Sequence, residues 1–219
     1  MWIPPPPAPE DEAALRGALG GARLFDQPAH RAKVDALLAF LEAPGPVCLE
    51  VGVDYGGRLL AQAAADPGTR WIGLEIKKPR VAALCTAAPP NCLVWAADAR
   101  VLLRRVLPPG RLSRVDVFFP TPTFERAHLL WSPAFVGALH RVLAPGGVVW
   151  SRTDVEGLHH HIAALLGDWS VAPQPDEAPV ASRRERGCAR EGWPVFSLCR
   201  RRPPDGDIPC AEPATTVDG

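Results

Sequence analysis

The 219-residue sequence lacks the features that would place it in a membrane or in a secretory pathway. No apolar run approaches the ~20 residues that a membrane-spanning helix needs. The first residues, MWIPPPPAPEDE, contain neither the basic segment nor the apolar segment of a signal peptide. We therefore expect a protein without a membrane segment that works in the cytoplasm.

Cysteine and histidine patterns that would bind zinc or build a disulfide framework are also missing. The six cysteines form no CxxC pair, and several lie in apolar runs, where a free thiol behaves as a small hydrophobic group. His159, His160 and His161 are consecutive, so on a helix they point in three directions and are poorly placed to share one metal ion. We expect reduced cysteines, as in the cytoplasm, and no metal site.

Neither sign of charge is in excess. The chain has 24 basic and 24 acidic residues, and this balance excludes a uniformly basic coat for nucleic acid while leaving room for a local basic patch. Residues 183–202 offer such a patch, with seven arginines and two acidic residues. The same arginines would equally suit a solvated edge of the protein, and the sequence leaves the oligomeric state open.

Proline and glycine are abundant, with 26 and 19 residues, and their positions delimit the expected parts of the chain. Prolines stand in the 4–9 segment, at the helix starts Pro79 and Pro133, in the 120–122 segment and after residue 202. The predicted parts are a flexible proline-rich N-terminus (1–9), an N-terminal helical segment (10–45), one α/β domain (46–202) and a disordered tail (203–219).

From residue 46 onward, short apolar runs alternate with segments that have helical spacing. This alternation predicts βαβ units, and therefore an α/β fold with a mostly parallel sheet and helices on both faces. The predicted strands span residues 47–52, 70–76, 92–98, 113–119 and 148–154, and two closing strands are expected at 168–173 and 193–201. No helix of comparable length is predicted between the two closing strands.

Acidic residues stand at the carboxyl ends of the first three predicted strands, where an open parallel sheet binds its ligands. These residues are Glu50, Glu75 and Asp98, of which Glu75 is placed for ribose hydroxyls and Asp98 for an adenine amine. The turn after Gly52 has Asp54 where a dinucleotide-binding turn has glycine, and a carboxylate there would repel a pyrophosphate. The pattern favours a nucleoside cofactor with positive charge and no phosphate, such as S-adenosylmethionine.

The motifs CLEVG, IGLEI, DA and FFPTP, followed by a strand ending in TD, resemble those of the bacterial tRNA (guanine-N7)-methyltransferases over residues 46–202. This resemblance implies the class I methyltransferase fold, a Rossmann-like seven-stranded sheet, with S-adenosylmethionine as cofactor and tRNA as substrate. It implies that the cofactor is bound by Glu50, Gly52, Gly56, Glu75, Asp98 and Ala99. It also implies that the target base is bordered by Pro120, Pro122, Thr153 and Asp154.

The resemblance breaks down in the loop after the fourth predicted strand. The aspartate that the family has at the reaction centre is Thr121 here, its tryptophan is Thr123, and its following lysine is Glu125. A later T-x-x-E element of the family corresponds to the stretch SRRERG (182–187), in which Glu185 is the candidate match. Thr121 therefore takes the catalytic position in a chain that diverges from the family at its substrate loop.

Methyl transfer to guanine N7 does not require the missing aspartate as a general base. N7 offers a lone pair that carries no proton, so methyl transfer needs positioning rather than a general base. The product ring is cationic, and Thr121 can form a hydrogen bond but cannot supply a stabilising charge. We expect cofactor binding to persist while activity on tRNA is reduced or redirected. Two alternatives stay open, namely a methyltransferase with another substrate and a non-catalytic paralogue that binds RNA or a protein.

Overall fold

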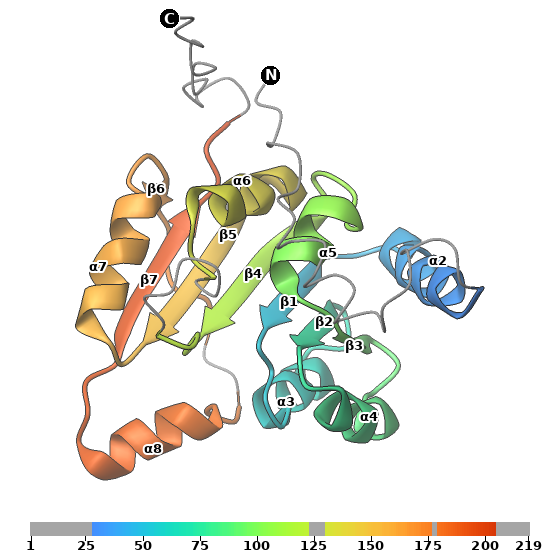
Figure 1. The fold of residues 1–219 in the computed structure, drawn as a ribbon, viewed down its shortest axis with the longest axis horizontal. Coiled ribbons are helices and arrows are strands. Elements are labelled where there is room, and N and C mark those ends of the chain that lie inside the picture. The colour runs from blue at the N-terminus through green and yellow to red at the C-terminus, as the bar shows by residue number, and fades with distance from the viewer. Residues whose placement is uncertain (1–27, 123–129, 177–178, 205–219) are drawn as a thin grey trace, which may run out of the picture.

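The structure, a computed structural model, describes residues 28–122, 130–176 and 179–204. Its centre is a seven-stranded sheet with the order β3-β2-β1-β4-β5-β7-β6 (Figure 1). The first five strands are parallel, whereas β7 is antiparallel to both of its neighbours, β5 and β6. This arrangement confirms the predicted Rossmann-like, mostly parallel sheet. The strands are β1 (Val47–Val51), β2 (Arg70–Glu75), β3 (Cys92–Ala96), β4 (Leu112–Phe118), β5 (Leu143–Thr153), β6 (Ser170–Val171) and β7 (Phe196–Arg201).

Helices cover both faces of the sheet. Successive residues of a strand point to opposite faces, so Leu49 and Cys48 of β1 belong to different cores. Leu49 lies in the core that includes residues of α2, α5, α6 and α7, and Cys48 lies in the core with α3 and α4. The described helices are α2 (Pro28–Glu42), α3 (Gly57–Ala65), α4 (Lys78–Ala87), α5 (Ala99–Arg105), α6 (Pro133–Val142), α7 (Glu156–Leu165) and α8 (Arg183–Glu191).

Helix α2 forms where the helical spacing of leucines predicts it, and it packs into the larger core. Leu37 and Leu41 are buried with residues of the sheet. The last carbonyls of a helix lack hydrogen-bond donors within the helix, and two arginine side chains from outside α2 donate to them here. Arg70 Nη1 donates to Phe40 O at 2.5 Å, and Arg111 Nε donates to Leu41 O at 2.8 Å. These contacts fix the end of α2 against the start of the sheet.

Helix α8 corrects the prediction of two closing strands with no helix of comparable length between them. Its residues are almost all polar, and Cys188 is its one buried residue, so hydrophobic periodicity could not reveal it. The available signal was the capping box in the stretch Ser182 to Glu185. Ser182 Oγ accepts from Glu185 N at 3.2 Å, and Glu185 Oε2 accepts from Ser182 N at 2.8 Å. The helix is thus specified by its first turn rather than by an apolar face.

Strand β5 begins earlier than the sequence suggests. The segment 143–147 reads as the end of a helix, but Leu143 pairs with Leu112 of β4 before a shift in register. The pairing then continues from Val148 opposite Arg114. The irregular pairing explains why the alternation of residues does not show where this strand starts.

The remaining predictions concern membrane segments, cysteines, metal sites and the two ends of the chain. Within the described ranges, no helix is long and apolar enough to cross a membrane. The five cysteines there are all free, and no cluster of three candidate metal ligands occurs among those residues. The proline-rich 1–9 segment, most of the 203–219 tail and Cys210 lie outside the described residues, so the predicted boundaries of these parts stay predictions.

Candidate functional site

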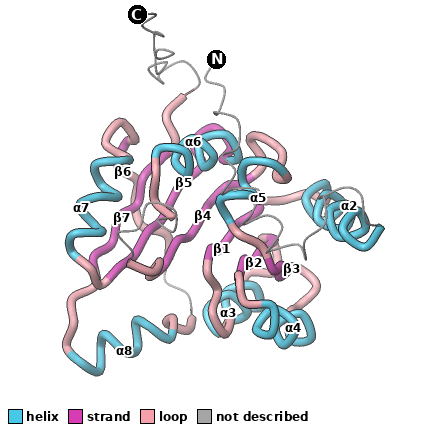
Figure 2. Tube along the Cα trace, viewed as in Figure 1, coloured by secondary structure: helices cyan, strands magenta, loops and turns pink. Residues whose placement is uncertain are grey.

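A cavity of about 920 Å³ lies at the carboxyl end of the sheet, between β1 and β4 on one side and α8 on the other. The strand order reverses between β1 and β4, and open α/β sheets bind ligands at such a switch point. Figure 2 shows loops from several strands gathered at this end of the sheet, with α3, α4 and α8 around them. The lining includes the predicted catalytic residue Thr121 and most of the other predicted site residues. For the cofactor these are Glu50, Gly52, Gly56, Glu75, Asp98 and Ala99, and for the substrate they are Pro120, Pro122 and Asp154.

The turn after β1 leaves its backbone open to the cavity. Gly52 has φ 78°, and a Cβ placed there would meet no atom within 4 Å. Asp54 has φ 51°, a left-handed conformation that aspartate tolerates better than most residues. Gly56 serves packing as well, since a Cβ there would lie 2.3 Å from Leu84 Cδ2 of α4. The turn therefore has positive φ at Gly52, Asp54 and Gly56.

Backbone N–H groups orient the acids that follow β2 and β3. Glu75 Oε2 accepts from Asp54 N at 3.0 Å, and Glu75 Oε1 accepts from Lys77 N at 2.9 Å. Asp98 caps α5, with Oδ1 accepting from Arg100 N at 2.9 Å. The Arg100 side chain also contacts both oxygens of Asp98, with Nη2 2.7 Å from Oδ2. Each carboxylate oxygen can accept two hydrogen bonds, so Glu75 keeps capacity for the hydroxyl donors of a ligand, whereas a ligand amine would share the Asp98 oxygens with Arg100.

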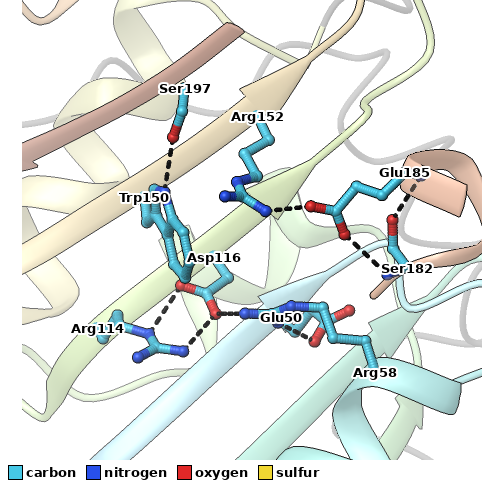
Figure 3. Close-up of polar contacts among 9 residues, drawn as sticks. All are labelled: Glu50, Arg58, Arg114, Asp116, Trp150, Arg152, Ser182, Glu185 and Ser197. Atoms are coloured by element: carbon cyan, nitrogen blue, oxygen red, sulfur yellow. Dashed lines mark hydrogen bonds and ion pairs between the residues drawn. The ribbon is translucent and has the colours of Figure 1, made fainter. Parts of the chain in front are cut away.

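A buried charge network, which sequence reasoning missed, supports the third acid, Glu50. Arg58 Nη1 lies 2.7 Å from Glu50 Oε2, and Arg58 Nη2 lies 3.0 Å from Asp116 Oδ2 (Figure 3). Arg114 holds the same Asp116 with two contacts, Nε to Oδ1 at 2.9 Å and Nη2 to Oδ2 at 2.8 Å. A signal was present, because Asp116 is a charged residue within an apolar strand, and such residues are almost always paired when buried.

Electrostatics in this network depend on the balance between burial and pairing. Burial raises the pKa of Glu50 to about 7, while Arg58 acts to lower it and Asp116 to raise it. Burial acts to lower the pKa of Arg58, but Glu50 and Asp116 outweigh that effect and hold it above its ordinary value. Burial therefore favours the neutral form of Glu50, and the Arg58 guanidinium favours the ionised form.

The substrate side of the cavity begins with an unusual backbone at the end of β4. Phe119 has φ 49°, a conformation that is strained for a bulky residue and is typical of functional sites. It leads into Pro120, Thr121 and Pro122, which line the cavity. Thr123 and Glu125 lie outside the described residues, so their predicted departures from the family loop carry no structural account.

Two ion pairs fasten the first turn of α8 to the end of β5. Arg184 pairs with Asp154, with Nε 3.1 Å from Oδ2, and Arg152 pairs with Glu185 Oε1 (Figure 3 shows the second pair). Thr153 does not line the cavity; its Oγ1 accepts from Val155 N at 3.1 Å and shapes the turn after β5. The predicted S-x-x-E element thus lies beside the cavity, which is lined by Ser182, Arg183, Arg184 and Arg186.

The chemistry of these cavity residues fits S-adenosylmethionine. Glu75 and Asp98 present oriented acceptors that suit hydroxyl and amine donors, and Glu50 presents a carboxylate that suits a cation. Gly52 gives a close backbone approach without a side chain. Carboxylates repel a pyrophosphate, so this set agrees with the expectation of a cofactor without phosphates.

Comparisons with known proteins agree with this geometry. A family model described as "Putative methyltransferase" matches residues 44–195. The tRNA (guanine-N(7)-)-methyltransferase of Saccharophagus degradans is 31% identical, with 76% of this chain and 78% of the relative covered. The enzyme of the same name from Pseudomonas entomophila is also 31% identical, with 85% of this chain and 84% of the relative covered.

Solved structures share the fold at much lower identity. The 16S rRNA methyltransferase KamB superposes with a TM-score of 0.58 at 18% identity, covering 81% of this chain and 94% of that one. A variant of the 16S rRNA (adenine(1408)-N(1))-methyltransferase of Catenulisporales acidiphilia, solved with cosubstrate SAM, also gives 0.58 at 18% identity, covering 87% and 98%. At this identity the likeness establishes the fold alone.

Proposed function

This chain belongs to the bacterial tRNA (guanine-N(7)-)-methyltransferase family, and we propose that it transfers a methyl group from S-adenosylmethionine to N7 of a guanine in tRNA. The observation that carries the proposal is the cavity at the β1–β4 switch point. That cavity joins three acids suited to the cofactor with the 120–122 loop and Asp154, which suit an acceptor base.

The chain's own residues divide the work of holding the cofactor. Glu75 would accept hydrogen bonds from ribose hydroxyls, and Asp98 would accept one from the exocyclic amine of adenine. Gly52 would let the backbone come close to the ligand, and Glu50 would face its positively charged end. When bound, the cofactor supplies an electrophilic methyl group on a sulfonium.

On the acceptor side, residues position the base and respond to the charge that it gains. N7 needs no general base, so a fixed orientation supplies much of the rate. Asp154 is the carboxylate that lines the cavity at the end of β5, and Arg184 pairs with it. Thr121 offers a hydroxyl where a carboxylate would stabilise the cationic product, so we expect slow turnover with intact cofactor binding.

Arginines at the cavity mouth suit the phosphates of tRNA. Arg183, Arg184 and Arg186 come from the first turns of α8 and line the cavity. Contacts to phosphate fix the position of a nucleic acid without reading its sequence. With tRNA as substrate and free cysteines at five described positions, we propose that the protein acts in the cytoplasm.

A methyl-transfer assay tests this function. The purified protein is incubated with labelled S-adenosylmethionine and unmodified tRNA, and the modified nucleoside is mapped, with an established tRNA guanine-N7 methyltransferase as positive control. We expect N7-methylguanosine. Its absence where the control works, together with labelling of another substrate or none at all, would contradict the proposal and favour one of the two alternatives.

A further inference from the structure

Two buried carboxylates lie side by side on neighbouring strands, and one of them, Glu50, lines the cavity. Glu50 of β1 and Asp116 of β4 are partners in the register of the two parallel strands, so their side chains share one face of the sheet. Glu50 is 4% exposed and Asp116 is 0% exposed. Adjacent buried like charges disfavour each other's ionised form unless a cation compensates them. The Arg58 guanidinium, which contacts both carboxylates, is that cation.

The other charged and titratable groups around Glu50 do not replace Arg58. Arg114 of β4 forms two hydrogen bonds with Asp116. Cys92 of β3 and Cys48 of β1 have their thiol pKa values raised to about 12 by burial, so both thiols are neutral near pH 7. Among the described residues, Arg58 is therefore the direct charge partner of Glu50.

Aromatic rings hold the Arg58 guanidinium in place. Its Cζ lies 4.2 Å from the ring centroid of Phe118 and 5.6 Å from that of Trp150. Stacking on an aromatic face suits the planar guanidinium and fixes the direction of its donors, which a lysine ammonium could not match. The two donors of Arg58 are thus aimed at Glu50 and Asp116 before any ligand binds.

The order of the acids along the sheet indicates which end of the cofactor Glu50 meets. Asp98 follows β3 and suits adenine, and Glu75 ends β2 and suits ribose. The remaining end of the ligand, with its amine and sulfonium, then reaches β1 and the side chain of Glu50. Arg58 contacts Oε2 of Glu50, whereas Oε1 has no contact with Arg58 and keeps its full capacity to accept from a ligand. A carboxylate attracts that cationic end only while it is ionised.

We propose that Arg58 is a positioning residue that keeps Glu50 ionised and aimed at the cationic end of S-adenosylmethionine. This inference rests on the proposed function, because it assumes that cofactor in the cavity. Arg58 acts through Glu50, so its contribution depends on the presence of the Glu50 carboxylate and on the charge of the ligand.

The sign of the expected pH dependence follows from the charges around Glu50. Burial raises the pKa of Glu50 to about 7, so affinity for a cationic ligand falls as pH drops through that region. Arg58 lowers this pKa, and its removal moves the fall in affinity to higher pH. Asp116 raises the same pKa, so removal of its charge moves the fall to lower pH.

Isothermal titration from about pH 5.5 to about pH 8 tests the inference, since this range brackets the titration of Glu50. The ligands are S-adenosylmethionine and 5′-methylthioadenosine, which has neither the amine nor the sulfonium. The proteins are wild type, Arg58→Gln, Asp116→Asn, Glu50→Gln and the double variant Arg58→Gln/Glu50→Gln. The Glu50→Gln protein lacks the titrating carboxylate, so its pH profile shows the effect of the ligand's own titration. This profile is subtracted from the others.

We expect Arg58→Gln to weaken S-adenosylmethionine binding about fivefold at about pH 7 and about tenfold at about pH 6, the effect of a rise of about one unit in the pKa of Glu50. Binding of 5′-methylthioadenosine should change by less than about twofold, which corresponds to a few tenths of a kcal/mol. In the Glu50→Gln background, Arg58→Gln should have no further effect on either ligand, because interacting residues are not additive. Asp116→Asn should move the fall in affinity for S-adenosylmethionine to lower pH.

Equal losses of both ligands in Arg58→Gln, or a loss that persists in the Glu50→Gln background, would show a merely structural role and overturn the inference. If thermal melting shows that Arg58→Gln does not fold, the pH profile of Asp116→Asn decides. A fall in affinity at the same pH as in the wild type, or at a higher pH, overturns the inference. A wild-type protein that binds 5′-methylthioadenosine as tightly as S-adenosylmethionine at every pH would overturn this inference alone. A wild-type protein that binds neither ligand would overturn the proposed function as well.

Discussion

One carboxylate in each half of the cavity, Glu75 and Asp154, is held in a different way. In the cofactor half, Glu75 at the end of β2 accepts hydrogen bonds from the backbone N–H groups of Asp54 and Lys77. In the substrate half, Asp154 after β5 is paired with the Arg184 side chain. Backbone donors stay in place when a ligand enters, whereas a side-chain pair can be exchanged for a charge on the ligand.

This difference separates an acceptor that is oriented before binding from one that must first exchange its partner. The Glu75 oxygens are held by backbone donors, and preorganised acceptors lose little entropy when they meet a ligand. Arg184 has a half-exposed side chain, and its pairing with Asp154 competes with any contact between Asp154 and a base. Thr121, which the resemblance places where the family has its loop aspartate, lines the same substrate half.

The largest effect is expected from the cofactor half. Glu75→Ala removes two oriented acceptors, and the loss of charge-assisted hydrogen bonds worth about 3 kcal/mol in total should weaken S-adenosylmethionine binding about a hundredfold. Isothermal titration measures this affinity. Glu156→Ala, an exposed acid in the first turn of α7, is the matched control and should bind normally. An affinity change below about threefold in Glu75→Ala, which is under 1 kcal/mol, would place the ribose elsewhere.

A smaller effect should come from restoring charge in the substrate half. Thr121→Asp supplies a carboxylate where the cationic product forms, and we expect kcat on tRNA to rise about tenfold or more with the cofactor Kd unchanged. Single-turnover methylation measures the rate. Thr121→Asn has nearly the same shape as the aspartate variant but no charge, and it should stay at the wild-type rate. Equal rates for the two variants would show that charge at this position does not matter.

The smallest effect concerns the arginines of α8. Replacing Arg183 and Arg186 with alanine should weaken tRNA binding and reduce the slope of log K against log salt by roughly 0.7 to 0.9 per lost phosphate contact. Filter binding at several salt concentrations measures both, while cofactor affinity should not change. Arg190→Ala is the matched control, because Arg190 lies on the same helix, does not line the cavity and is 77% exposed. An equal loss in the control would indicate diffuse attraction rather than contacts at the cavity mouth.

Sequence reasoning reached the parts of the site that depend on short stretches of chain. Glu75 ends a strand and precedes a helix, so its place at the carboxyl edge follows from the alternation of elements alone. Helix α8 escaped because only Cys188 is buried, and the hydrophobic pattern that reveals other helices is absent. Its capping box, which begins at Ser182, was readable in the sequence and gives the more reliable signal for a polar helix.

The sequence by itself determined the α/β architecture and the three acids at successive strand ends, because both follow from periodicities and signals local to the chain. Tertiary structure alone decided which charges meet. Arg58 and Asp116 are 58 positions apart, and Arg152 and Glu185 are 33 apart. Their pairing depends on the register of β1 against β4 and on where α8 docks beyond β5, and no local pattern encodes either. The charge state of Glu50, and with it the inferred affinity for the cofactor, is therefore a property of the assembled sheet.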